Sequence, residues 1–171
     1  RRRQRQMCIR DRREAGAVAF TDGDRSVMNA LTMRRALSYA SNFDALIVQH
    51  ALDQDLQSAG VMHEGELATR LGLTGIPVAA ETAIIDRDIR LVELTSARYH
   101  ISQVSSGESV EAVRQAKARG LAVSCAVSAA HLMLNENDVE NYRTFAKLNP
   151  PLRSEDDRLA LVDGLADGTI D

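Results

Sequence analysis

The fold of this chain is most constrained by a regular alternation of short apolar runs with longer amphipathic segments. Four apolar runs are typical of buried strands: residues 15–22 (AGAVAFTD), 44–50 (DALIVQH), 98–105 (RYHISQVS) and 121–128 (LAVSCAVS). Amphipathic patterns predict helices over residues 27–43, 80–95, 107–120 and 154–168. Strands that alternate with helices of this length form right-handed βαβ units, so we predict an α/β fold around a parallel sheet.

The longest connection, residues 51–79, is punctuated by glycine and predicts an active-site loop with a short helix. A fifth strand is predicted to begin at residues 169–171. No glycine-rich phosphate loop follows any predicted strand, which argues against a Rossmann or Walker nucleotide site. The pattern favours a partial (β/α)8 TIM-type barrel, because a full barrel takes about 250 residues and this chain has 171.

Charge divides the chain into an arginine-rich head, residues 1–13, and an acidic body, residues 14–171. The head holds seven arginines, whereas the body has 14 basic and 23 acidic residues, a net charge of −9. A negative body repels phosphate backbones and anionic membranes, so we expect neither nucleic acid nor a membrane as a partner. The head is interpreted as non-native sequence, of the kind that translated adapter read-through produces, and is expected to be disordered; the alternative is a basic arm for RNA or membrane. The body is the predicted barrel domain.

Cysteine and hydropathy patterns predict a cytoplasmic protein. Cys8 lies in the head and Cys125 in an apolar run, so we predict neither a disulfide framework nor a CxxC metal pair. We recognise no signal peptide, and no window approaches the roughly 18 apolar residues of a membrane span.

Three residues of metal-ligand type lie at or near the ends of successive predicted strands: Asp22, His50 and His100. In a barrel the carboxyl ends of the strands surround the active site, so these side chains are expected at one mouth. Imidazole and carboxylate groups suit Zn²⁺ or a similar divalent ion. Each residue also has a structural explanation, since a single histidine at a strand end is often hydrogen bonded and Asp22 is a turn former. Spacing alone leaves both explanations open.

The remaining histidines are less informative. His63, in VMHEGE, is predicted to be a loop or helix-start residue, because HEGE lacks the second histidine of a zincin helix. His131 follows a predicted strand and either supports a metal ligand or is structural. Ser105 and Ser106 lack the G-x-S-x-G elbow, which argues against a serine hydrolase.

Several longer segments together resemble the class I dihydroorotases of the amidohydrolase superfamily. The segments are EAGAVAFTDGDRSVMNALTMRRAL, LIVQHALDQDL, GVMHEGELATRLGLTGIP, RYHISQVSS, SVEAVRQAKARGL and NPPLRSEDDRLALVDGLADGTID. The resemblance spans residues 14–171 and implies the middle-to-late βα units of a zinc-dependent barrel. It also implies an enzyme of de novo pyrimidine biosynthesis that interconverts L-dihydroorotate and N-carbamoyl-L-aspartate. A hydroxide held by one or two zinc ions attacks the ring carbonyl of dihydroorotate in that family.

The resemblance assigns roles to particular residues. His50 and His100 match metal-binding histidines, and Asn149 in NPPLR matches a substrate-binding asparagine. The family's bridging aspartate falls opposite Gly23, because this chain reads Asp-Gly-Asp where the family reads Asp-Asp-Gly. Either Asp22 or Asp24 is therefore expected to replace it, or the ligand is absent.

The resemblance also implies that essential groups lie outside this chain. The family's paired histidines and substrate-binding arginine are expected before residue 14, and its proton-shuttle aspartate after Asp171. No catalytic residue is therefore predicted here, and the isolated chain is expected to be inactive and poorly soluble. A family His-His pair is also replaced by Ala130-His131.

Two functions remain open for the complete protein. One is an active dihydroorotase, which retention of His50, His100 and Asn149 favours. The other is a non-catalytic dihydroorotase-like subunit that supports aspartate transcarbamoylase as a structural partner. The departures at Gly23 and Ala130 favour the second, and a homo-oligomer is compatible with either.

Overall fold

The chain was analysed as a computed structural model, which describes residues 9–171. Its centre is a parallel sheet of four strands in the spatial order β1-β2-β5-β6. The strands are β1 (Ala19–Thr21), β2 (Leu46–Gln49), β5 (Arg98–Ile101) and β6 (Val123–Cys125). Each lies inside one of the four apolar runs, so the α/β fold with a parallel sheet is confirmed.

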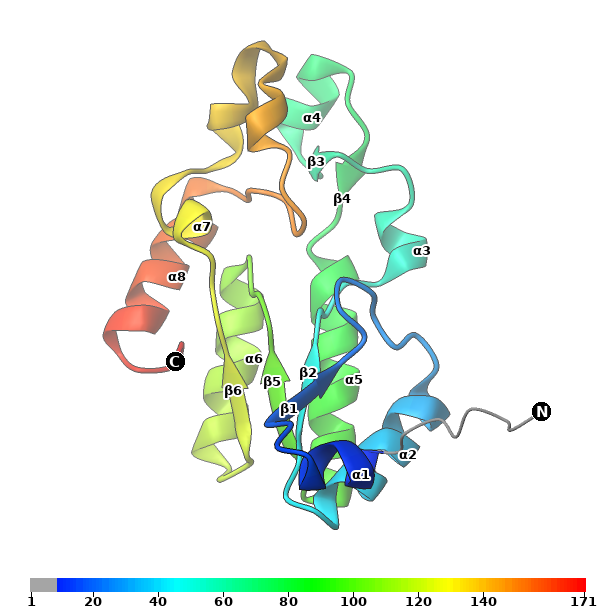
Figure 1. Cartoon of the computed structure of the whole chain (residues 1–171). Coiled ribbons are helices and arrows are strands. Elements are labelled where there is room, and N and C mark those ends of the chain that lie inside the picture. The colour runs from blue at the N-terminus through cyan, green and yellow to red at the C-terminus, as the bar shows by residue number, and fades with distance from the viewer. Residues whose placement is uncertain (1–8) are drawn as a thin grey trace, which may run out of the picture.

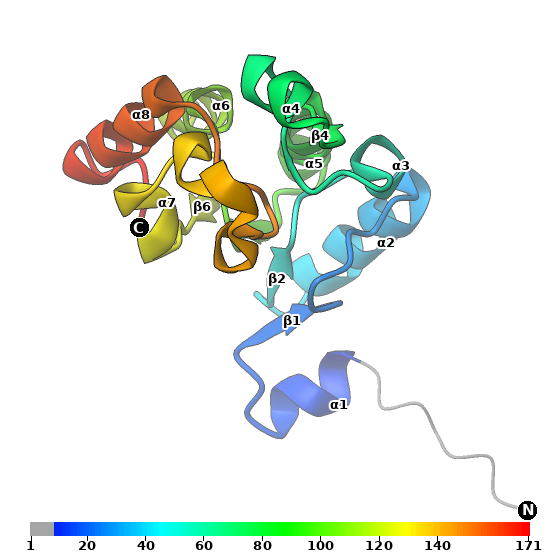
Figure 2. The same cartoon turned by 90° about the horizontal axis from the view of Figure 1, so that it is seen from above.

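Helices cover one face of this sheet and follow it in an arc (Figure 1 and Figure 2). They are α2 (Ala30–Ser41), α5 (Ala79–Thr95), α6 (Gly107–Ala118) and α8 (Glu155–Ala166). Side chains satisfy the free amides at several helix starts, since Asn29 accepts from Thr32 N and Ser154 accepts from Asp157 N. Three acidic residues in the first turn of α8 add favourable charge, which confirms the predicted start of that helix.

The main core lies between the sheet and these helices. Tyr99 and Ile101 of β5 are fully buried against the helical layer, together with Leu37 of α2, Ile85 of α5 and Val113 of α6. Alternate strand residues point to opposite faces. The intervening row is Thr21, Val48, His100 and Ser124, which are paired in register and are half-buried or exposed. Strand periodicity therefore places His100 on the face opposite the helices.

The connection 51–79 has more structure than the predicted loop with one short helix. It contains α3 (Gln54–Gln57), β3 (Met62–His63), α4 (Glu66–Leu71) and β4 (Gly75–Ile76), with β3 and β4 parallel. A Cβ atom at Gly75 would lie 2.4 Å from Glu64 Cα, so only glycine permits this close approach. Strands of two residues are too short to show a period in sequence, which explains why they were not predicted.

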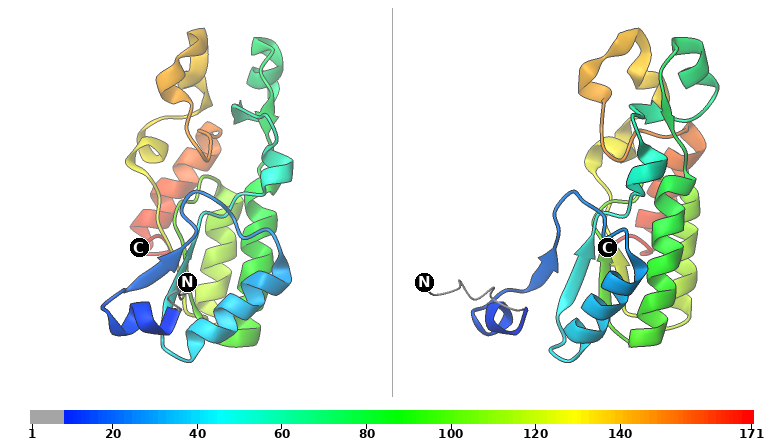
Figure 3. Two further views of the ribbon diagram at one scale, coloured as in Figure 1. Left: turned by 45° about the vertical axis from the view of Figure 1, so that its right-hand side comes forward. Right: turned by 90° about the vertical axis from the view of Figure 1, so that its right-hand side faces the viewer.

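A second segment packs against this connection. It contains α7 (Ala129–Met133), η1 (Glu136–Tyr142) and η2 (Thr144–Ala146). The two segments share a small core formed by Met62, Leu67, Ala68, Val139, Ala146 and Leu152. We call residues 53–77 and 135–152 the upper lobe, because they stand together beyond the carboxyl ends of the strands (Figure 3).

Both ends of the described chain differ from expectation. Residues 1–8 of the head lie outside the described residues, whereas Ile9–Glu14 form α1 instead of a disordered arm. The predicted strand at 169–171 is not formed, although Asp171 N donates to Cys125 O at 3.0 Å along the edge of β6. A β-strand requires a series of regularly spaced hydrogen bonds to its neighbour, and this single bond does not provide one. Within residues 9–171, no helix has the length and apolar character needed to cross a membrane.

Candidate metal and substrate site at the carboxyl edge

His50 offers an unengaged nitrogen at the carboxyl end of the sheet. It follows the last residue of β2, is 7% exposed, and its Nε2 is buried without a hydrogen-bond partner. Burial lowers the pKa of His50 below its ordinary value, against the opposing charges of Glu81 and Asp24. Neutral imidazole is the form that binds metal ions. A buried nitrogen atom without a hydrogen-bond partner is also unfavourable unless another group binds it.

His100 lies on the neighbouring strand. It pairs with Val48, two residues before His50, so strand alternation carries both histidines toward the same face. The His100 Nδ1 atom lies 2.8 Å from Ser124 Oγ on β6, which orients the ring and leaves Nε2 for another ligand. Burial lowers the pKa of His100, and the positive charge of Lys117 acts in the same direction.

The two candidate carboxylates lie in the turn after β1. Asp22 and Asp24 are both exposed, and Gly23 between them has a φ of 75°, a conformation that favours glycine. Asp24 is one of the charges that raise the pKa of His50, and Asp22 is not among them. We therefore propose Asp24 over Asp22 as the candidate carboxylate.

His50 and His100 have the chemistry of metal ligands. The orphaned His50 Nε2 and the oriented His100 ring fit a divalent ion of the zinc type. However, residues 9–171 contain no group of three His, Cys, Asp or Glu residues arranged to hold a metal. The predicted convergence of Asp22 with both histidines is therefore not present as a complete ligand set.

The predicted substrate residue, Asn149, lies in the upper lobe. It is exposed, and its Oδ1 accepts a hydrogen bond from Gln57 Nε2 at 3.4 Å. The next residue, Pro150, is held by His131, whose Nε2 donates to the Pro150 carbonyl at 3.1 Å. The His131 Nδ1 atom in turn accepts from Ser128 Oγ at 2.7 Å. Both ring nitrogens of His131 are thus engaged by Ser128 and Pro150 and not by a candidate metal ligand, which favours its structural explanation over support of a metal ligand.

Three buried charged residues were not predicted from the sequence: Glu81, Asp88 and Arg153. Glu81, in the first turn of α5, is 0% exposed, and Arg153, just before α8, is 2% exposed. Their positions in an amphipathic helix and a loop predict ordinary surface charges, so no sequence pattern marked them. His63 lies in β3, and its Nδ1 accepts from Arg153 Nη1 at 3.2 Å, away from the carboxyl ends of the four-stranded sheet.

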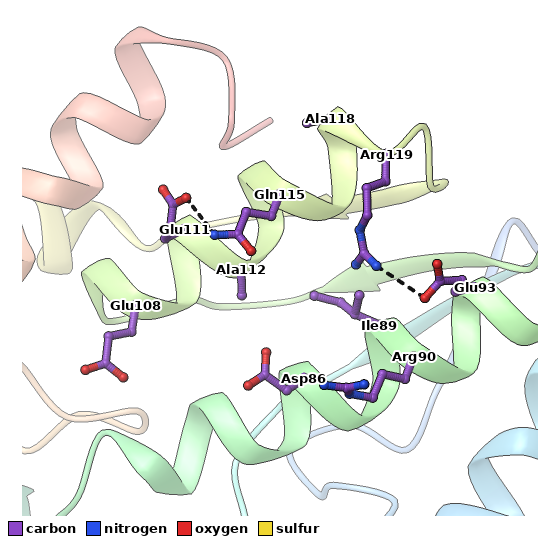
Figure 4. A pocket seen from close by; sticks show the side chains of 10 residues that line it. All are labelled: Asp86, Ile89, Arg90, Glu93, Glu108, Glu111, Ala112, Gln115, Ala118 and Arg119. Carbon is purple, nitrogen blue, oxygen red and sulfur yellow. Dashed lines mark hydrogen bonds and ion pairs between the residues drawn. The ribbon is translucent and has the colours of Figure 1, made fainter.

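The groove on the outer helical surface does not coincide with this edge, whereas a cavity beside β1 reaches it. A groove of about 730 Å³ lies between α5 and α6 on the outer helical surface (Figure 4). Arg119 crosses it to reach Glu93 at 3.2 Å, and Gln115 donates to Glu111 at 3.0 Å. None of the predicted site residues lines this groove. A second cavity of about 400 Å³ follows β1 and includes Asp22.

Comparison with solved structures defines the class of fold. The D-hydantoinase (dihydropyrimidinase) from Thermus sp. covers 95% of this chain and 38% of its own length, with a TM-score of 0.74 and 22% identity. The L-hydantoinase (dihydropyrimidinase) from Arthrobacter aurescens covers the same shares, with a TM-score of 0.77 and 25% identity. The four-stranded unit is therefore a portion of the TIM-type barrel found in cyclic amidohydrolases.

Sequence comparison identifies the family within that class. Residues 7–109 match the family described as dihydro-orotase-like. The dihydroorotase of Ehrlichia canis (strain Jake) is 50% identical over 160 residues, which is 93% of this chain and 36% of the relative. The dihydroorotase of Pelotomaculum thermopropionicum is 50% identical over 161 residues, 94% of this chain and 38% of the relative. The chain belongs to the dihydroorotase-like family and spans little more than a third of these relatives.

Proposed function

We propose that the complete protein containing this chain is a zinc-dependent dihydroorotase, which interconverts L-dihydroorotate and N-carbamoyl-L-aspartate in pyrimidine biosynthesis. The observation that carries this proposal is the 50% identity to dihydroorotases over 93% of the chain. The identity to the L-hydantoinase of Arthrobacter aurescens over a similar span is only 25%. The higher sequence identity to dihydroorotases supports dihydroorotate as the substrate over the substrates of other enzymes that share the fold.

The proposed roles follow from the carboxyl edge of the sheet. His50 and His100 would hold the metal, with Asp24 as the nearer carboxylate and further ligands from outside the described residues. When bound, zinc lowers the pKa of a water molecule and polarises the carbonyl of a cyclic amide. Burial keeps His50 neutral for this purpose, and Ser124 orients the His100 ring. Asn149 would contact dihydroorotate from the upper lobe.

Zinc content and dihydroorotate hydrolysis of the complete protein test this proposal together. His50→Ala and His100→Ala should each lower bound zinc and turnover by at least about 10-fold, the order reported for groups that support metal ligands. Gln115→Ala, in the outer groove, is the matched control and should change neither. Turnover that survives both histidine replacements would refute the ligand assignment. A zinc-loaded wild-type protein without turnover would refute the function.

A second candidate is a non-catalytic subunit that supports aspartate transcarbamoylase. The glycine at position 23 favours this alternative, because the turn has no side chain where the resemblance expects a carboxylate. The φ of Gly23 is 75°, a conformation that suits glycine. On this alternative the complete protein should form a stable complex with aspartate transcarbamoylase in size-exclusion chromatography and should not hydrolyse dihydroorotate. A complex with full turnover would leave the enzyme proposal intact.

A further inference from the structure

Arg153 is a buried cation that joins several loops beneath the upper lobe. It lies four residues after Asn149 and is 2% exposed. Its Nη1 donates to Ile76 O at 2.5 Å and its Nη2 to Pro77 O at 3.4 Å, just before α5. Nη1 also reaches His63 Nδ1 at 3.2 Å. A planar guanidinium can hold several acceptors at once, which a lysine ammonium cannot do in the same geometry.

The positive charge of Arg153 is linked to the negative charge of Glu81 through the side chain of Ser105. Arg153 Nε donates to Ser105 Oγ at 3.1 Å, and the Ser105 hydroxyl donates to the carboxylate of Glu81. The main-chain amide of Ser105 donates to the other Glu81 oxygen at 2.9 Å. Burial lowers the pKa of Arg153, and the negative charge of Glu81 is the largest opposing effect. Buried ions persist only when paired and hydrogen bonded, so Ser105 links two charges that depend on one another.

The segment between Asn149 and Arg153 is fixed in place at both of its ends by hydrogen bonds. Pro150 and Leu152 are buried, His131 bonds the Pro150 carbonyl at 3.1 Å, and Arg153 anchors the other end. Asn149 is exposed and directly precedes these buried residues. In the view of Figure 1 the connection between η2 and α8 dips toward the carboxyl ends of β2 and β5.

We propose that Arg153 is a positioning residue for Asn149, and that the Arg153–Ser105–Glu81 chain sets the affinity of the site for a small cyclic amide. The proposal rests on the proposed function, because it takes dihydroorotate as that cyclic amide. Arg153 reaches the loop after β5 through Ser105, but none of its hydrogen bonds is to His50 or His100, so its effect should fall on substrate binding more than on the metal.

The first test measures dihydroorotate binding to the complete protein by calorimetry, with bound zinc and turnover measured on the same samples. Arg153→Met should raise Kd and KM by about 10-fold, since one hydrogen bond to a charged group is worth roughly that factor. Bound zinc should change much less than Kd, and kcat should stay within about 3-fold, as expected for a loss of uniform binding. Arg153→Lys should recover only part of the affinity. Ser105→Ala removes only the bridging hydroxyl and provides the same measurement should Arg153→Met fail to fold.

The second test asks whether Arg153 acts through Asn149. Asn149→Ala should weaken binding by itself, and adding Arg153→Met should then cost less than about 2-fold more, because residues that act as a unit are not additive. Full additivity, or an unchanged Kd in Arg153→Met, would overturn the proposal. Wild-type protein that binds dihydroorotate without hydrolysing it would refute the enzyme proposal and leave this inference standing. Wild-type protein that does not bind dihydroorotate would refute the inference itself.

Discussion

The hydroxyl group of Ser26 donates a hydrogen bond to the main-chain carbonyl of His50. The same hydroxyl oxygen accepts from Leu52 N at 2.9 Å and lies 2.6 Å from Leu52 O. One buried side chain of the loop after β1 thereby satisfies the backbone on both sides of Ala51. Because that loop also carries Asp22 and Asp24, Ser26 joins the candidate carboxylates to the candidate imidazole ligand.

Replacement of Ser26 by alanine should therefore affect both stability and metal binding. Ser26→Ala removes the bond that Ser26 donates to the His50 carbonyl and the bond that it accepts from Leu52 N, which keeps only its bond to His50 O at 3.1 Å. The loss should cost about 1 kcal/mol in the free energy of unfolding. Urea denaturation of the complete protein measures this loss, and zinc affinity should fall with it. Ser38→Ala, on the exposed side of α2, is the control and should stay within about 0.5 kcal/mol of wild type. Equal effects of the two changes would contradict the role given to Ser26.

The choice between Asp22 and Asp24 can be decided by comparing two isosteric changes. Asp24 raises the pKa of His50, so Asp24→Asn should lower that pKa further and weaken zinc binding by about 10-fold. Asp22→Asn should have little effect on either quantity. Competition with a zinc chelator measures the affinity, and proton NMR of His50 in zinc-free protein measures the pKa. A larger effect of Asp22→Asn would reverse the assignment.

The buried contact between Tyr99 and Asp88 should contribute strongly to stability. The Tyr99 hydroxyl donates to Asp88 Oδ2 at 2.7 Å, and both residues are 0% exposed. Burial raises the pKa of Asp88, and the bond from Tyr99 opposes that shift. Tyr99→Phe should thus lower the free energy of unfolding by about 1.5–3 kcal/mol and raise the pKa of Asp88 further.

The control for that change removes a phenolic hydroxyl from the surface. Tyr142 is 61% exposed, and its hydroxyl donates to Leu71 O at 2.9 Å. Tyr142→Phe should cost less than about 1 kcal/mol, because water can replace the lost bond. Chemical denaturation that ranks Tyr142→Phe as the more damaging change would show that the Tyr99–Asp88 contact is not a major stabilising interaction.

Acid should destabilise the protein through His131. Burial lowers the pKa of His131 below its ordinary value of 6.5, so the unfolded chain binds more protons than the folded chain as pH falls through 6.5. The stability contributed by this group is complete above pH 6.5 and is lost as pH falls toward the lower folded pKa. The loss has a limiting slope of about 1.4 kcal/mol per pH unit.

His131→Gln isolates this contribution, since a glutamine amide can still donate to the Pro150 carbonyl but does not titrate. Urea denaturation between pH 5 and pH 8 should show a shallower acid-side decline for the variant than for wild type. A chelator in every sample removes zinc release as a second source of pH dependence. Parallel curves for the two proteins would show that His131 does not titrate differently on unfolding.

Local pattern predicted the repeating unit well. The four strands lie inside the four apolar runs, and α8 begins directly after Ser154, where a capping residue precedes three acidic residues. The upper lobe was missed because β3 and β4 have two residues each and its core draws on distant segments, as in the contact of Leu67 with residues near Val139. The periodic spacing of apolar side chains along the sequence does not indicate which distant segments pack together.

The sequence by itself determined the β/α order, the family and the two histidines at strand ends, because these depend on periodicity and on residue identity along the chain. The tertiary structure alone decided that His131 has both nitrogens engaged and that Arg153 and Glu81 are joined through Ser105. Those relationships connect residues from separate loops. Charge balance and hydrogen bonding in a buried site depend on distances in space, which sequence spacing does not provide.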